Sequence, residues 1–255
     1  MAGLKQDSPG RQDMTLTIAL LSVLVGFIGG ATSSGGILLI PALQYSAGMP
    51  LPVAAATVLC SFAFSTSFGA WVHWRIGNLD KSIVLPMSLG AVIFGCLGAL
   101  AKYIVGEVTL NAILASIIIF SGVVALKPPR ASVGMASDKR RFKAFMLVGA
   151  GVAFLAGLTG MGGGVLSVPI TVVMGVSPLA AVAAAQPFQA IACISGSVGN
   201  AMLDQIIWPV AIISAALQCM SFWAGASLAK RMDTSKLKTC ISLISILTGF
   251  YMLFK

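Results

Sequence analysis

The chain has 255 residues, of which 58% are hydrophobic and 9% charged, with a mean hydropathy of +0.98 and a formal net charge of +9. A soluble domain carries about 25% charged residues, so this composition excludes a soluble globular fold and predicts a polytopic helical membrane protein. The positive charge gathers in loops between apolar runs, as in membrane proteins generally, and predicts no nucleic-acid partner.

Eight apolar segments follow one another, with a basic loop at 127–143 between the fourth and the fifth. They cover residues 15–47, 53–74, 82–104, 108–126, 144–175, 178–203, 206–229 and 237–254. The first follows a stretch of mixed charge that has no small-residue cleavage site, so we expect a retained helix rather than a signal peptide. The five cysteines lie inside apolar runs without metal-ligand spacing, which predicts neither a disulfide nor a metal site.

The chain repeats itself at a shift of 128 residues, half its length. The shift pairs Gly29 with Gly157, Gly35 with Gly163, Gly36 with Gly164, Leu38 with Leu166 and Pro41 with Pro169. We therefore predict two repeat halves, 1–127 and 128–255, within a single transmembrane domain. Internal symmetry with a glycine break at matching places is typical of transporters whose site lies between the repeats.

The first and fifth segments are interrupted by glycines, at 32–36 and 159–164. A membrane span needs about 20 residues, so each segment is too long for one span and too short for two spans with a turn. Consecutive glycines allow a sharp bend, which predicts a re-entrant hairpin of two half-helices. The predicted fold is all-α, with two repeats that each contain such a hairpin and three transmembrane helices.

The basic residues favour inverted over parallel halves. If each broken segment crosses once, the halves are parallel and the 16 basic residues split eleven to five between the two sides of the membrane. If each segment is re-entrant, the halves are inverted and the split is twelve to four. The larger asymmetry favours inversion, which also brings both glycine turns to the middle of the membrane.

The two glycine turns are the predicted substrate site. A helix that begins at such a turn offers backbone N–H groups without an intrahelical partner, at the positive end of its dipole. Two such helix starts facing each other would bind a small oxyanion without a formal positive charge. The alternative is that the glycines only allow close helix packing. The candidates are Thr32, Ser33, Ser34, Gly35 and Gly36 in the first turn and Gly162, Gly163 and Gly164 in the second.

Polar residues recur on one face of the helix that follows each turn, at spacings of three and four. They are Gln186, Gln189, Cys193, Gly196 and Asn200 in the sixth segment and Thr57, Ser61 and Ser65 in the second. An amide facing lipid is costly, so these faces should contact protein or a cavity. Gln186, Gln189 and Asn200 join the predicted substrate site; hydrogen bonding between helices is the alternative, above all for the hydroxyls.

No carboxylate lies deep in an apolar run, since Glu107 and Asp204 sit at segment ends. The sequence therefore names no proton relay, and both a co-transported ion and a homodimer stay open. No cofactor is predicted. His73 stands beside Trp74 and Arg75, a cluster typical of an interfacial anchor, with a role in gating as the alternative.

The doubled Gly-Gly-x-Leu-x-x-Pro pattern resembles the TauE/SafE family of sulfite exporters, also called the 4-toluene sulfonate uptake permease family. Each copy is followed by a Pro nine residues on and by an Ala-rich helix, and the resemblance covers essentially the whole chain. It implies a multi-pass transporter of the bacterial plasma (inner) membrane for sulfite, sulfoacetate or aryl sulfonates. The family's glycine turns map onto Gly35, Gly36, Gly163 and Gly164, while Thr32–Ser34 replace the usual further glycines.

The leading hypothesis is therefore a transporter of small sulfur oxyanions and not an enzyme. No nucleotide-binding motif is present, so we expect a secondary transporter driven by an ion gradient or by the anion's own gradient. One alternative is a transporter of another small organic or inorganic anion. A remote alternative is an intramembrane hydrolase with Ser33 or Ser34 as nucleophile and His73 as base. Neither serine lies in a Gly-x-Ser-x-Gly frame.

Overall fold

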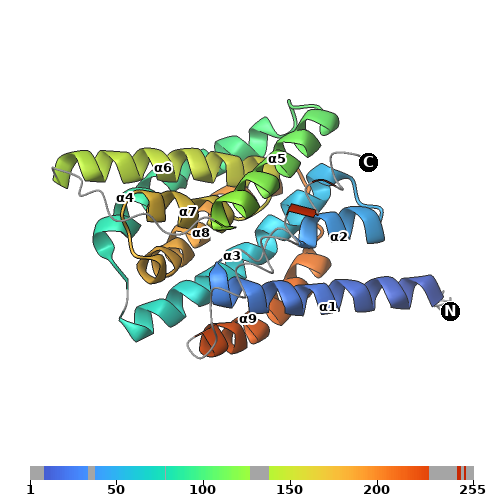
Figure 1. Cartoon of the computed structure of the whole chain (residues 1–255). Helices are drawn as coiled ribbons and strands as arrows, with labels where there is room; N and C mark the ends of the chain where they lie inside the picture. The colour runs from blue at the N-terminus through green and yellow to red at the C-terminus, as the bar shows by residue number, and fades with distance from the viewer. Residues whose placement is uncertain are drawn as a thin grey trace.

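The computed structural model describes residues 9–33, 38–77, 79–126, 138–229, 246–247 and 250. Within these ranges the chain forms helices and no strands, which confirms the all-α prediction (Figure 1). The helices are α1 (Pro9–Thr32), α2 (Leu39–Ser46), α3 (Leu51–Ile76), α4 (Lys81–Ala101), α5 (Glu107–Leu126), α6 (Asp138–Thr159), α7 (Gly164–Val173), α8 (Pro178–Ala201) and α9 (Trp208–Ala229).

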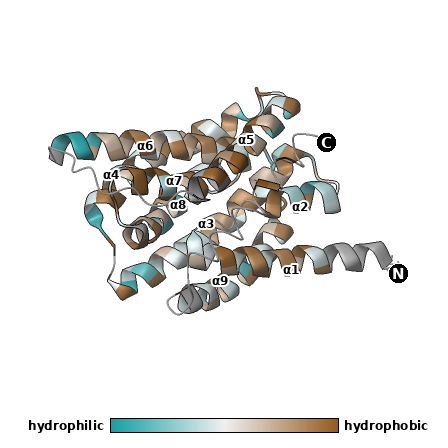
Figure 2. Cartoon of the chain, viewed as in Figure 1, coloured by the Kyte–Doolittle hydropathy of each residue, from teal (hydrophilic) through white to brown (hydrophobic). Residues whose placement is uncertain are grey.

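Five of the described helices are long and apolar enough to cross a membrane, namely α3, α4, α6, α8 and α9. Figure 2 shows hydrophobic residues along the helices and hydrophilic ones at the start of α6 and around the connection from α3 to α4. Leu20, Ile93 and Ile213 each expose more than half of their surface. Such outward-facing aliphatic residues are stable in lipid, so the chain is a multi-pass membrane protein.

Each predicted hairpin has a long helix followed by a short one; the second hairpin joins them through the glycine turn at 160–163, whereas residues 34–37 of the first lie outside the described residues. The two long helices, α1 and α6, have 24 and 22 residues, whereas α2 and α7 have 8 and 10. At about 1.5 Å per residue, the first arm of each hairpin is about as long as the hydrocarbon core is thick. Only the second arm is the half-helix expected from the sequence, because each glycine turn comes late in its segment.

The two halves pack through matching pairs of helices. In the first half, α4 packs along α6 of the second, and α9 of the second half packs along α1 of the first. The contacts of α4 with α8 and of α9 with α3 form another such pair. Exchanging the halves by the 128-residue shift turns each of these contacts into the other, so the packing follows the repeat.

Gly98 of α4 marks a close approach of α4 to α6, because a Cβ there would overlap the backbone carbonyl of Phe154. We expect Gly98→Ala to lower the melting temperature, since overpacking a well-packed contact costs about 1–3 kcal/mol. Gly106 is the matched control, because a Cβ there meets no atom within 4 Å. Equal melting temperatures for Gly98→Ala and Gly106→Ala would contradict a tight crossing.

Candidate functional site

The second glycine turn directs the start of α7 into the bundle. Gly160, Gly162 and Gly163 have φ angles of +81°, +75° and +83°, a left-handed conformation that glycine adopts without strain. Gly163 is the N-cap of α7, and its carbonyl accepts hydrogen bonds from the N–H groups of Leu166 (3.2 Å) and Ser167 (2.9 Å). The turn is buried throughout, so the positive end of the α7 dipole lies inside the protein.

The first turn begins with Thr32 and Ser33, which behave differently. The Thr32 hydroxyl donates to the Ile28 carbonyl (3.0 Å) of its own helix. Ser33 has a φ of +60°, the conformation that often ends a helix, and its hydroxyl donates to the Val182 carbonyl of α8 (3.2 Å). The remaining predicted residues of this turn, Ser34, Gly35 and Gly36, lie outside the described residues.

The two turns contact each other directly. A Cβ at Gly164 would overlap the carbonyl oxygen of Ser33 and lie 2.5 Å from Nε2 of Gln189. The end of α1 therefore rests on the first residue of α7, with an amide side chain beside the contact. In this conformation the Ser33 carbonyl lies against the first residue of α7.

Gln186 and Gln189 of α8 both donate to Ser33. Nε2 of Gln186 donates to the Ser33 hydroxyl (2.5 Å) and to the Gly29 carbonyl (3.4 Å). Nε2 of Gln189 donates to the Ser33 carbonyl over a longer distance, 3.5 Å. Both side chains are buried. The structure thus brings four predicted residues into one cluster: Ser33, Gly164, Gln186 and Gln189.

Gln218 of α9 adds a third buried amide, which the sequence analysis missed. Its Nε2 donates to the Ser61 hydroxyl (3.1 Å), while its Oε1 accepts no hydrogen bond from the described residues. Ser214 and Ser221 flank Gln218 at spacings of four and three, so α9 also has a polar helix face, whereas the repeat places Gly90 opposite Gln218 and gives no signal there. The available signal was the cost of an amide in a membrane-spanning helix.

The hydroxyl face of α3 divides between two roles. Thr57 donates to the Val53 carbonyl (2.8 Å) and accepts from the N–H of Ile207 (3.1 Å), which fixes the segment before α9. Ser65 lines a small cavity together with the three amides. Thr57 therefore has a structural role, whereas Ser65, two turns further along α3, borders the cluster.

Asn200 lies apart from the glycine turns. It is eleven residues beyond Gln189 on α8, about 16 Å along the helix axis. Its Oδ1 accepts from the Tyr103 hydroxyl (3.1 Å), and its Nδ2 donates to the Gly196 carbonyl (3.0 Å). Asn200 thus lies on the same face of α8 as Gln186 and Gln189, but it is too far along the helix to contact the glycine turns.

The cavity beside the cluster has a volume of about 20 Å³. This is room for about one water molecule, so the cluster is closed in this conformation. Its lining comes from α1, α3, α8 and α9, together with Met161 of the second turn. The amides and the Ser33 hydroxyl supply its hydrogen-bonding groups without a formal charge.

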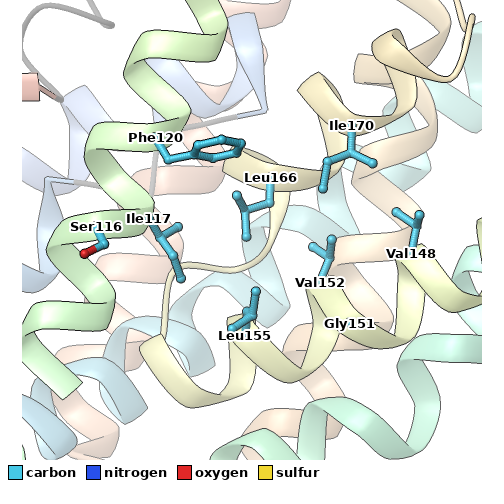
Figure 3. A pocket seen from close by; sticks show the side chains of 9 residues that line it. All are labelled: Ser116, Ile117, Phe120, Val148, Gly151, Val152, Leu155, Leu166 and Ile170. Carbon is cyan, nitrogen blue, oxygen red and sulfur yellow. The ribbon is translucent and has the colours of Figure 1, made fainter. Parts of the chain in front are cut away.

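A larger cavity, of about 470 Å³, lies between α5, α6 and α7 (Figure 3). Its lining is aliphatic and aromatic apart from Ser116, whose hydroxyl points away from the other lining side chains in Figure 3. Desolvating an oxyanion without hydrogen-bond donors is costly. This cavity therefore does not suit such a ligand.

The described residues contain no group of three His, Cys, Asp or Glu that could hold a metal ion. The Ser33 hydroxyl is held by the Gln186 amide and the Val182 carbonyl. An amide does not accept a proton as a general base must. The arrangement around Ser33 thus favours binding over nucleophilic catalysis.

Comparison with known proteins places the chain in a family context. Residues 18–252 match the family model described as Sulfite exporter TauE/SafE. The chain is similar to two proteins of Bacillus subtilis (strain 168), each described as a probable membrane transporter protein. It is 28% identical to YdhB over 111 residues, 44% of each chain, and 27% identical to YjnA over 169 residues, 60% of this chain and 65% of YjnA. Each alignment spans less than two thirds of the relative's length.

Proposed function

This chain belongs to the sulfite exporter TauE/SafE family, and we propose that it is a secondary transporter of small sulfur-containing oxyanions such as sulfite, sulfoacetate or sulfonates. It would act in the bacterial inner membrane. The observation that carries the proposal is the contact of Ser33 with Gly164 beside the buried amides of Gln186 and Gln189. These groups offer donors to an anion at the N-terminus of α7, where the helix dipole favours negative charge.

In the closed conformation, the oxygens of Ser33 occupy the donors that a substrate would use. Its hydroxyl accepts from Gln186, its carbonyl accepts from Gln189, and the same carbonyl rests on Gly164. An oxyanion would take over these donors once the two turns separate. Exchanging one set of acceptors for another keeps the buried amides paired, which limits the cost of opening.

We infer that the halves are inverted, so that the cycle opens the cluster to one side and then to the other. Figure 1 supports this arrangement, since α1 begins at the right-hand end of the bundle and α6 at the left-hand end. Parallel halves would start these two equivalent helices on the same side.

The inverted arrangement predicts that the loops 127–143 and 230–238 lie in the cytoplasm and both termini outside. Single cysteines introduced at Ser8 and Ser132, in a background without accessible cysteines, should therefore react with an impermeant thiol reagent from opposite sides of the membrane. Both positions lie outside the described residues, so the test is independent of the helix contacts. Labelling of both from the same side would contradict inversion.

The substrate class is tested by flux into proteoliposomes that contain the purified protein. We expect saturable uptake of radiolabelled sulfite, competed by sulfoacetate and an aryl sulfonate but not by acetate or chloride. Empty liposomes give the background. Competition by acetate alone would favour the alternative of another small anion, and the absence of flux for every anion tested would contradict the proposal.

A further inference from the structure

Lys102 is 0% exposed and is among the largest fully buried side chains of the described residues. It lies in the turn that joins α4 to α5, one residue after α4 ends. Its Nζ donates to the Pro52 carbonyl of α3 (3.4 Å) and lies 5.2 Å from the centre of the Tyr103 ring. The C-terminal end of α4 and the ring face both favour a cation there, but neither neutralises its charge.

Several titratable groups lie at the same end of the bundle as Lys102. Neighbouring elements bring Tyr45 of α2, Tyr103 of the same turn, Glu107 of α5 and Asp204 after α8 to this end of the bundle. The Glu107 carboxylate accepts from the N–H of Leu51 (3.0 Å). Within the described residues, no carboxylate forms an ion pair with Lys102. Burial raises the pKa of Tyr103 to about 12, so its hydroxyl remains a donor to Asn200.

A buried ammonium without a counter-charge is costly, and such a group usually loses its proton instead. Burial lowers the pKa of Lys102 to about 7. The side chain therefore changes its charge with small changes in its surroundings. An anion close to it would favour the charged form, and the charged form would in turn bind the anion more tightly by the same factor.

A continuous helix face connects Lys102 with the glycine turns. On α8, the face that holds Gln186 and Gln189 continues through Cys193 and Gly196 to Asn200. Asn200 accepts from the hydroxyl of Tyr103, the residue next to Lys102. Lys102 thus lies at the end of the bundle that this face reaches, next in sequence to the residue that donates to Asn200.

We propose that Lys102 binds a proton together with the transported anion, so that transport is coupled to proton movement. The inference rests on the proposed anion transport. When the turns open and the anion reaches the end of α8, the neutral amine takes one proton from water and becomes an ammonium paired with the anion. When the anion departs, the ammonium returns that proton to water. The stoichiometry is one proton for each anion.

The experiment measures flux and proton movement in the same proteoliposomes. Radiolabelled sulfoacetate is the probe, because its two acid groups stay ionised near neutral pH and carry no proton of their own. An enclosed pH dye reports the protons. For the native chain we expect about one proton per anion, and a rate that falls about tenfold per pH unit above pH 7, as the protonated fraction of a lysine with that pKa falls.

Two variants and one control separate this role from a structural one. Lys102→Met should move no proton and lose the pH dependence. Lys102→Arg holds a charge that it cannot release, so it should bind sulfoacetate without pH dependence and also move no proton. Lys81, an exposed lysine at the start of α4, is the control, and Lys81→Met should keep the native ratio of protons to anions.

A stability measurement provides a readout besides activity. The folded state holds Lys102 with a pKa of about 7 against an ordinary value of 10.5, so between these values the unfolded chain binds more protons. The stability of the native chain therefore rises with pH across that window. Lys102→Met lacks this term, so its melting temperature should exceed the native value most at pH 7 and below, with the gap shrinking towards pH 10.

Three results have distinct meanings. Sulfoacetate flux in the native chain without proton movement overturns the role of Lys102 but leaves the proposed function intact. The role of Lys102 is also overturned if Lys102→Met moves as many protons per anion as the native chain. Where Lys102→Met does not fold, Lys102→Arg provides the same test. No flux of sulfoacetate, sulfite or an aryl sulfonate in the native chain contradicts the proposed function itself, and the inference falls with it.

Discussion

Gly164→Val should abolish anion flux and lower the melting temperature of the purified protein. The new side chain would overlap the Ser33 carbonyl and the amide of Gln189. One of its contacts is a backbone oxygen, which moves only with the whole turn, so the closed conformation cannot form as it does in the native chain. The branched side chain would also obstruct the α7 N-terminus from which an anion would take its hydrogen bonds.

The matched control is Gly151→Val on α6, because a Cβ at Gly151 meets no atom within 4 Å. We expect near-native flux and melting temperature for this variant. Near-native flux in Gly164→Val would leave close packing as the only role of Gly164. Gly36→Val, at the equivalent place in the first half, should have the same effect on flux, although Gly36 lies outside the described residues.

Gln189→Leu should weaken anion binding by roughly ten- to a hundred-fold while changing stability little. A hydrogen bond to a charged group contributes on the order of 1.5–3 kcal/mol, which corresponds to that change in affinity. In the closed conformation the bond from Gln189 to the Ser33 carbonyl is long, 3.5 Å, so its loss removes little from the folded state. Gln186 forms a much shorter bond to Ser33, and Gln186→Leu should lower both affinity and stability.

The measurement pairs the Kd for sulfite with the melting temperature of each variant. A residue that only joins helices contributes about 0.6 kcal/mol to stability. Its loss would lower the melting temperature and leave the Kd for sulfite unchanged. Gln205→Leu serves as the control, because Gln205 lies after α8 and donates locally to the Leu203 carbonyl. An unchanged Kd for Gln189→Leu with a lowered melting temperature would assign the amide to the scaffold.

The helix breaks were predictable because they depend on local chemistry. α1 ends at Thr32 and α6 at Thr159, where glycines and small polar residues follow in the sequence. Because the two glycine turns are equivalent in the repeat, a break at one supported a break at the other. The sequence could predict only that the buried polar groups of Ser33 and Gln186 would each need a hydrogen-bond partner. Their actual contact depends on how α1 packs against α8, and a one-dimensional pattern does not contain that information.

Two features show where the sequence falls short. Gln218 shares a face of α9 with Ser214 and Ser221, but that pattern does not say which helix the face meets, so only the fold reveals its neighbour Ser61. Asn200 shares a helix face with Gln189, yet the eleven-residue separation places it about 16 Å further along the helix, away from the glycine turns. The residue that explains Asn200 is Tyr103, at the end of α4, and no short-range rule connects these two positions.

The exchange of packing partners between the halves also sets the order in which the bundle can assemble during synthesis. α4 and α6 are separated by one helix, so they can pair soon after both are in the membrane. α1 is made before the other described helices, but its main partner α9 begins only at Trp208. Until then, the face of α1 with Gly26 and Gly30 contacts lipid or a chaperone instead of α9. The first of the described helices to be made is thus among the last to reach its final packing partner.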